Sequence, residues 1–158
     1  MISLNKPILW TFRRCPYAMR TRLTIKASGI KVYLREIQLR SKPEAFVQDS
    51  EKATVPVLKL PDGKVIEESL EIMSWALSEN DPGKWQDIMV NEPDYSSNFL
   101  RELDGDFKQA LDRYKYANRY HLDKKSALDF RDLGSIFLAK INKRLLENAH
   151  LSGPHQGF

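Results

Sequence analysis

The chain has few of the residues that build disulfides, metal sites or membrane spans. It contains one cysteine, Cys15, so no disulfide can form within a single chain, and its three histidines lack the spacing of zinc ligands. No stretch approaches the roughly 18 uninterrupted apolar residues of a membrane helix, and the opening segment MISLNKPILW does not have the pattern of a secretory signal. We therefore expect no metal, no membrane, and a reducing cytoplasmic setting.

Charge of one sign is not concentrated in any part of the chain either. The 25 basic residues outnumber the 21 acidic ones and give a net charge of +4, but the two kinds are interleaved along the sequence. A nucleic-acid interface would need a basic stripe with interspersed aromatic side chains. We therefore expect no nucleic-acid partner, although a modest positive potential favours a small anionic ligand.

The first half of the sequence alternates strand-like and helix-like stretches. PILWTF predicts a buried strand, residues 16–28 predict a helix that ends at Gly29, and KVYLREIQL predicts a second strand. SKPEAF predicts a capping box, with Ser41 as the N-cap and Glu44 three residues later. VPVLKL and VIEE flank the turn PDGK as hairpin strands, and Ser69 is predicted to cap a third helix. This order, βαβαββα, predicts an α/β fold around a mixed sheet.

The second half is helical and follows a segment rich in turn-forming residues. Residues 80–94, NDPGKWQDIMVNEPD, carry two prolines and a glycine and are predicted to be a linker. Beyond them, apolar residues recur at spacings of three and four, which predicts one long amphipathic helix through residues 99–114 and another over about 126–149. We therefore expect two domains, 1–79 and an all-helical 95–158.

Cys15 lies where the first predicted strand ends and the first predicted helix begins. The free N–H groups and partial positive charge of a helix N-terminus stabilise an anion, and Pro16 suits the first helical position because its missing N–H is not needed there. Four arginines near the cysteine add positive charge: Arg13, Arg14, Arg20 and Arg22. These features favour the thiolate, the nucleophilic form of cysteine, over the alternative of an inert buried thiol.

The chemistry open to this thiolate is limited by the absence of a second cysteine. The position three residues on, where dithiol redox enzymes carry their second cysteine, is Ala18. A mixed disulfide at Cys15 therefore cannot be resolved within the chain and needs an outside thiol. This requirement points to a small-molecule thiol such as glutathione.

Three segments together resemble the cytosolic glutathione transferases, and most of all the omega and omega-like classes that use cysteine: CPYAMRTRLTIKASGI, LRSKPEAF and ATVPVLKLPDGKVIEESLEI. The resemblance covers residues 7–79 and implies a thioredoxin-like first domain, with Cys15 as the catalytic cysteine that forms a mixed disulfide with glutathione. Residues 95–150 resemble only the first helices of the family's all-helical second domain. The resemblance therefore implies a helical domain that is truncated in this chain.

The resemblance also implies roles for other residues. The backbone of Val55 would pair with the cysteinyl part of glutathione, and Pro56 matches a proline that is cis in this family. Glu68 and Ser69 match the pair that holds the γ-glutamyl end, and Lys42 matches the lysine that meets the glycyl carboxylate. Apart from any family, a helix N-terminus is a favourable site for a carboxylate, and Glu68 beside it can accept an ammonium group.

These roles imply a glutathione transferase that acts as a thiol transferase, with glutathione as co-substrate, a small electrophilic or disulfide acceptor, and homodimerisation as the family habit. Two alternatives stay open: a non-catalytic binding or regulatory protein with the same fold, and a truncated form with low activity. Tyr17 is a further candidate, because other classes activate glutathione with a hydroxyl. Its place two residues beyond the strand end favours packing on the helix instead.

Overall fold

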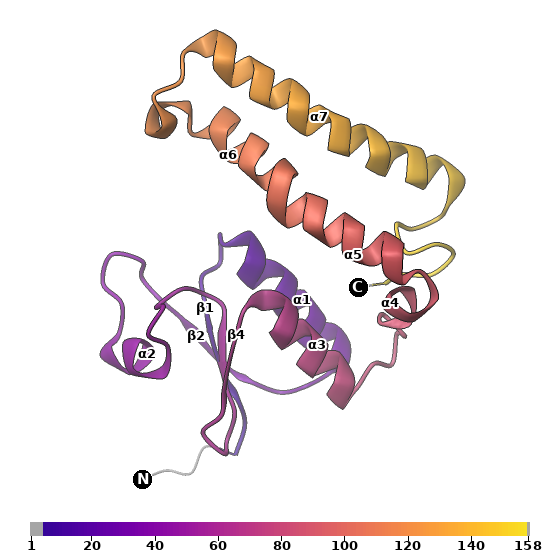
Figure 1. Ribbon diagram of the computed structural model, residues 1–158. Coiled ribbons are helices and arrows are strands. Elements are labelled where there is room, and N and C mark those ends of the chain that lie inside the picture. The colour runs from indigo at the N-terminus through magenta and orange to yellow at the C-terminus, as the bar shows by residue number, and fades with distance from the viewer. Residues whose placement is uncertain (1–4, 158) are drawn as a thin grey trace. The chain divides into compact units, whose positions relative to one another are not determined.

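A computed structural model describes residues 5–157 of the chain (Figure 1). Residues 1–4, which open the segment expected to lack a secretory signal, and residue 158 lie outside the described residues. The chain divides into two compact units, with the boundary between Gly83 and Lys84. This boundary falls inside the predicted linker, 80–94, although that range also holds a short helix, α4 (Asp87–Asn91).

The N-terminal unit has the predicted order of strands and helices. Its elements are β1 (Ile8–Thr11), α1 (Pro16–Ser28), β2 (Tyr33–Glu36), α2 (Glu44–Asp49), β3 (Val57–Lys59), β4 (Val65–Glu67) and α3 (Ser69–Glu79). The strands lie in the sheet order β2-β1-β3-β4, with β1 and β2 parallel and the other neighbours antiparallel. The predicted mixed sheet and thioredoxin-like fold are therefore confirmed.

The sheet buries side chains on both faces because successive residues of a strand point to opposite sides. One face packs with the helices α1 and α3, which lie beside each other in Figure 1. The core on that face consists of Leu9, Ile25, Leu58, Ile66, Ile72 and Ala76. The core on the other face, where α2 supplies Phe46, consists of Trp10, Ile37, Phe46 and Val57. The alternation of Leu9 with Trp10 on β1 joins the two cores through the sheet.

Both predicted N-caps are wrong. The N-cap of α2 is Pro43, and no side chain caps this helix. Because the α region is disfavoured for a residue that precedes proline, the helix starts only after Lys42-Pro43, and the N–H of Ser41 donates instead to the carbonyl of Gln38 at 3.1 Å. In α3, Ser69 is the first helical residue, and the N-cap is the residue before it.

The second unit is helical, as predicted, but its first long helix is not uniform. Its elements are α4, α5 (Pro93–Glu102), the π-helical segment η1 (Leu103–Phe107), α6 (Lys108–Lys115), the 3-10 turn η2 (Ala117–Tyr120) and α7 (Lys124–Glu147). Phe99 and Phe107 both pack on Phe137 of α7, with ring centroids 5.4 and 4.9 Å apart. Leu111 and Tyr114, expected on the apolar stripe, are exposed. Within residues 5–157, no helix combines the length and apolarity needed to cross a membrane.

Candidate active site

Cys15 is the N-cap residue of α1, where the chain leaves β1 and turns into the helix. Its backbone is extended (φ −77°, ψ 119°), and Pro16 follows as the first helical residue. The Cys15 N–H donates to the carbonyl of Phe12 at 3.1 Å, and its carbonyl accepts from the N–H of Met19 at 2.9 Å. The side chain is half-buried, and the first turn of α1 carries no acidic residue. The sulfur therefore lies at a helix N-terminus with no carboxylate in that turn to oppose an anion.

The structure brings Cys15 and Val55 together across 40 residues of sequence. Cys15 Sγ lies 3.6 Å from the carbonyl oxygen of Val55, to which the thiol donates. The peptide bond between Val55 and Pro56 is cis, as the resemblance implies. Val55 precedes the paired residues of β3, which begin at Val57. Its backbone therefore lies beside the sulfur and outside the strand ladder.

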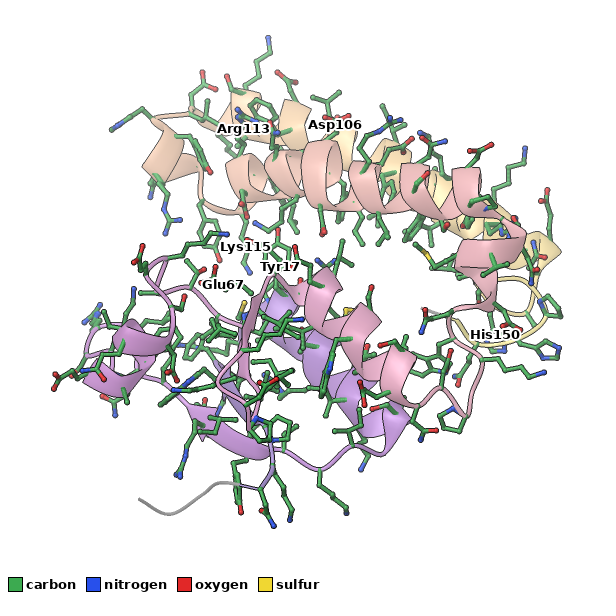
Figure 2. The ribbon with its side chains drawn as sticks, turned by 60° about the horizontal axis from the view of Figure 1, so that its bottom comes forward. Tyr17, Glu67, Asp106, Arg113, Lys115 and His150 are labelled. Atoms are coloured by element: carbon green, nitrogen blue, oxygen red, sulfur yellow. The ribbon has the colours of Figure 1, made fainter. Side chains whose placement is uncertain are left out.

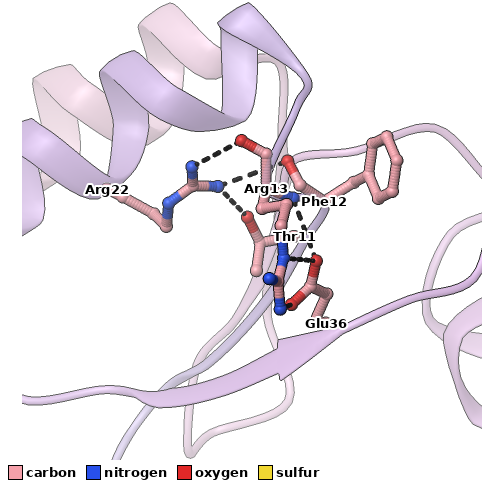
Figure 3. Close-up of polar contacts among 5 residues, drawn as sticks. All are labelled: Thr11, Phe12, Arg13, Arg22 and Glu36. Atoms are coloured by element: carbon pink, nitrogen blue, oxygen red, sulfur yellow. Dashed lines mark hydrogen bonds and ion pairs between the residues drawn. The ribbon is translucent and has the colours of Figure 1, made fainter.

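Two of the four arginines near Cys15 hold the loop in front of it (Figure 3). Arg13 forms an ion pair with Glu36 of β2, with both contacts at 2.8 Å. The hydrogen bond from Arg13 lowers the pKa of Glu36 to about 2, and Glu36 raises the pKa of Arg13. Arg22 donates to the Thr11 hydroxyl at 2.7 Å and to the carbonyl of Phe12 at 3.3 Å. The positive charge of Arg13 is thus compensated, contrary to the expectation that every arginine adds to the field at Cys15.

A third arginine, Arg20, connects α1 to the start of α3. Its Nε and Nη2 atoms donate to Ser69 Oγ at 3.0 and 2.7 Å. Its guanidinium also lies 5.0 Å from the ring centroid of Tyr17, which is in the first turn of α1 (Figure 2). Ser69 is only 4% exposed. No local sequence pattern predicts this contact, because the two residues are 49 positions apart.

Glu68 precedes α3 and has a positive φ of 61°. Its carboxylate pairs with Lys52 at 3.0 Å, and Lys52 also lies 3.6 Å from Glu67. The hydrogen bond to Glu68 is the main reason that the pKa of Lys52 is raised. Lys52 belongs to the loop between α2 and β3, and sequence reasoning missed it.

Lys42 is exposed in the segment before α2. Within residues 5–157, the structure gives it no hydrogen bond or ion pair with another predicted site residue. Among the other predicted residues, Cys15 contacts Val55, Ser69 is linked to α1 through Arg20, and Glu68 pairs with Lys52. The helices α1 and α3 begin at the same end of the unit (Figure 1). The arrangement thus combines a cysteine, a backbone segment free of the ladder and a second helix N-terminus, which suits a peptide-like thiol with a carboxylate.

Comparison with known proteins identifies relatives of this unit. Residues 9–85 match the family model "Glutathione S-transferase, N-terminal domain". Pig glutathione S-transferase omega-1 is 40% identical over 76 residues, which are 48% of this chain and 31% of the pig protein. Human glutathione S-transferase omega-2 is 37% identical over 62 residues, 39% of this chain and 26% of the human protein. The chain thus spans only about a third to a quarter of the length of these curated relatives.

Solved structures of glutathione transferases share the fold. Glutathione transferase Omega 3C from Trametes versicolor matches 98% of this chain and 68% of its own, with a TM-score of 0.81 and 17% identity. The unclassified glutathione S-transferase 2 from Bombyx mori matches 96% and 72%, with a TM-score of 0.81 and 14% identity. The fold and the family match together define a glutathione S-transferase N-terminal domain followed by a helical region. Residues 9–85 thus match the N-terminal domain family of the glutathione transferases, and this part of the chain is similar to the omega class.

Proposed function

We propose that this chain is a cysteine-type glutathione transferase that acts as a thiol transferase, with glutathione as its co-substrate. The observation that carries the proposal is the position of Cys15. Its sulfur lies at the N-cap of α1 and 3.6 Å from the carbonyl of Val55, beside the cis peptide bond to Pro56. This geometry supports the proposal, because a thiol at a helix N-terminus lies next to a backbone segment that can pair with a peptide-like ligand.

Glutathione fits this site as an extended peptide. Its cysteinyl part would pair with the backbone of Val55, which places the glutathione sulfur near Cys15. Its γ-glutamyl carboxylate would meet the N–H groups in the first turn of α3, beginning at Ser69. Glu68 would accept the ammonium group of the same end, and Lys42 would meet the glycyl carboxylate in solvent.

The proposed reaction is a pair of thiol–disulfide exchanges. The Cys15 thiolate attacks the glutathione sulfur of a glutathionylated acceptor. A bond forms between Cys15 and glutathione, the acceptor's sulfur leaves with the electron pair, and it takes up a proton from solvent. The thiolate of a second glutathione then attacks the glutathione sulfur of this mixed disulfide, which releases glutathione disulfide and restores the Cys15 thiolate.

Intact-mass measurement after incubation with oxidised glutathione tests the assignment of Cys15. We expect one glutathione per chain, removed by reductant, because no second cysteine is present to expel it. Cys15→Ser should lose both the adduct and turnover but still bind reduced glutathione within a few-fold. Tyr17→Phe should keep the adduct. Turnover that survived Cys15→Ser and was lost in Tyr17→Phe would instead identify a hydroxyl-type enzyme.

We also propose a cytoplasmic location, where Cys15 stays reduced, a homodimer, and a small electrophilic or disulfide acceptor. These three proposals rest on the family resemblance and on the single thiol. Sedimentation of the purified chain tests the dimer, and turnover with a panel of glutathionylated and electrophilic compounds tests the acceptor. A purely monomeric chain, or turnover with neither class, would reject the corresponding proposal.

A further inference from the structure

The hydroxyl of Ser69 has an unusual environment for the first residue of a helix. It is buried, and it accepts two hydrogen bonds from the same guanidinium, from Nε at 3.0 Å and from Nη2 at 2.7 Å of Arg20. Both contacts cross from α1 to α3. The hydroxyl does not cap α3, because no side-chain cap hydrogen bond is present at this helix start.

These two hydrogen bonds decide what the hydroxyl can still do. A serine hydroxyl has one O–H donor and two acceptor lone pairs. Arg20 occupies both lone pairs, so only the O–H remains for another partner, and among the described residues it donates to none. The N–H groups of the first turn of α3 are also donors without partners inside the helix. The hydroxyl and the free N–H groups of this helix start are therefore donors, which favours a carboxylate ligand at that point, although Glu71 also lies in the first turn.

We infer that Arg20 is a positioning residue that makes Ser69 a dedicated hydrogen-bond donor to the γ-glutamyl carboxylate of the ligand. The inference rests on the proposed function in one respect, that the ligand is glutathione. Arg20 suits the role because its planar guanidinium offers two donors in a fixed fork, whereas lysine offers a point charge. A cation–π contact with the ring of Tyr17, 5.0 Å from its centroid, also positions the guanidinium from its own helix.

The test compares glutathione with an analogue in which the γ-glutamyl α-carboxylate is a carboxamide. The wild-type chain should prefer the carboxylate about tenfold or more, as expected for a hydrogen bond to a charged group. Arg20→Met should lose most of this preference, and Ser69→Ala should lose a similar part. The double variant should be no worse than either single variant, because the two residues act as one unit.

Three controls separate positioning from folding. Lys26→Met removes a positive charge from an exposed position of the same helix and should leave the preference unchanged. The rate at which a small disulfide without a γ-glutamyl group modifies Cys15 should be the same in Arg20→Met as in wild type. Arg20→Lys keeps the charge but not the fork, so its preference should fall several-fold even if Arg20→Met does not fold.

The possible failures are distinguishable. If the wild-type chain binds neither ligand, the proposed function fails and this inference fails with it. If the wild type binds glutathione and prefers the carboxylate, but the Arg20 variants keep that preference, the role of Arg20 is wrong and the proposed function stands. Fully additive effects of Arg20→Met and Ser69→Ala would also overturn the role.

Discussion

At the residue scale, the candidate site is built from charged side chains whose partners come from other elements. Arg13 pairs with β2, Arg20 holds the start of α3, and Lys52 pairs with Glu68. Each contact fixes a segment of the N-terminal unit, so each gives a substitution whose effect can be measured separately.

Glu68 and Lys42 are expected to contribute unequally to glutathione binding. Glu68→Gln should raise the Kd about threefold to tenfold, because the hydrogen bond from the ligand's ammonium group then goes to a neutral amide oxygen and loses its charge assistance. Lys42→Met should raise it only about twofold, because an ion pair in solvent is screened. Calorimetric titration measures both. A larger effect at Lys42 than at Glu68, or no effect at either, would reject the ligand-binding roles that the family resemblance implies for these two residues.

The ion pair between Arg13 and Glu36 should make stability depend on pH in the acid range. The pKa of Glu36 is lowered from 4.5 to about 2 by its hydrogen bond with Arg13. A lowered carboxyl pKa stabilises the fold at pH values above the ordinary pKa, and that stability is lost as the pH falls from 4.5 towards 2. Glu36→Gln should therefore flatten the pH dependence of urea unfolding over this window.

Glu79→Gln is the control for that measurement, because it neutralises an exposed carboxylate at the end of α3. It should leave the steeper acid dependence of the wild type in place. Equal slopes for wild type and Glu36→Gln would show that the ion pair does not contribute to folding.

At the element scale, two glycines differ in whether their backbone conformation requires glycine. Gly29 ends α1 with a φ of 74°, in the left-handed region that other residues avoid. Gly134 lies inside α7, where an added Cβ would be 3.7 Å from Phe107 and 3.9 Å from Ala110, which are ordinary contact distances. The conformation of Gly29 therefore requires glycine, and the helical conformation of Gly134 does not.

Alanine substitution at these glycines should change stability with opposite signs. Gly134→Ala should stabilise the chain by about 0.5–1 kcal/mol, because alanine favours a helix interior and the space is sufficient. Gly29→Ala should destabilise it by about 1 kcal/mol, because the left-handed conformation is strained for a residue with a Cβ. Urea unfolding followed by circular dichroism measures both. Changes of the same sign would contradict this assignment.

At the scale of the whole molecule, each unit has its own core. In the N-terminal unit, Phe46 is fully buried, and its ring centroid lies 5.5 Å from that of Trp10 on β1. This contact joins α2 to the sheet face opposite α1 and α3. In the helical unit, the aromatic cluster on Phe137 joins α7 to α5 and η1.

Phe46→Ala should destabilise the N-terminal unit by about 3–5 kcal/mol, since it leaves a cavity in a closed core. Phe46→Leu keeps most of the volume and should cost less than about 1.5 kcal/mol. Tryptophan fluorescence during urea unfolding reports the change, because Trp10 contacts this ring. Similar losses for the two variants would show that the site collapses around the smaller side chain.

Local patterns predicted the elements well where one short signal decides them. The helix over 16–28 and its end at Gly29 were confirmed, since proline at the first position and glycine after the last act within a few residues. The hairpin around PDGK was confirmed for the same reason. The two N-caps were wrong because a proline at position 43 and a guanidinium from another helix overrode the serine preference. The π-helical η1 has no signal in the apolar periodicity.

The sequence by itself determined the order of elements and the place of Cys15 at a strand-to-helix junction, because these depend on neighbours a few positions apart. Only the tertiary structure decided which arginine does what. The partners of Arg13 and Arg20 lie 23 and 49 positions away. Their contacts depend on the parallel register of β1 with β2 and on the packing of α1 against α3. No local pattern encodes those distances, so four arginines that look alike in the sequence have different roles in the fold.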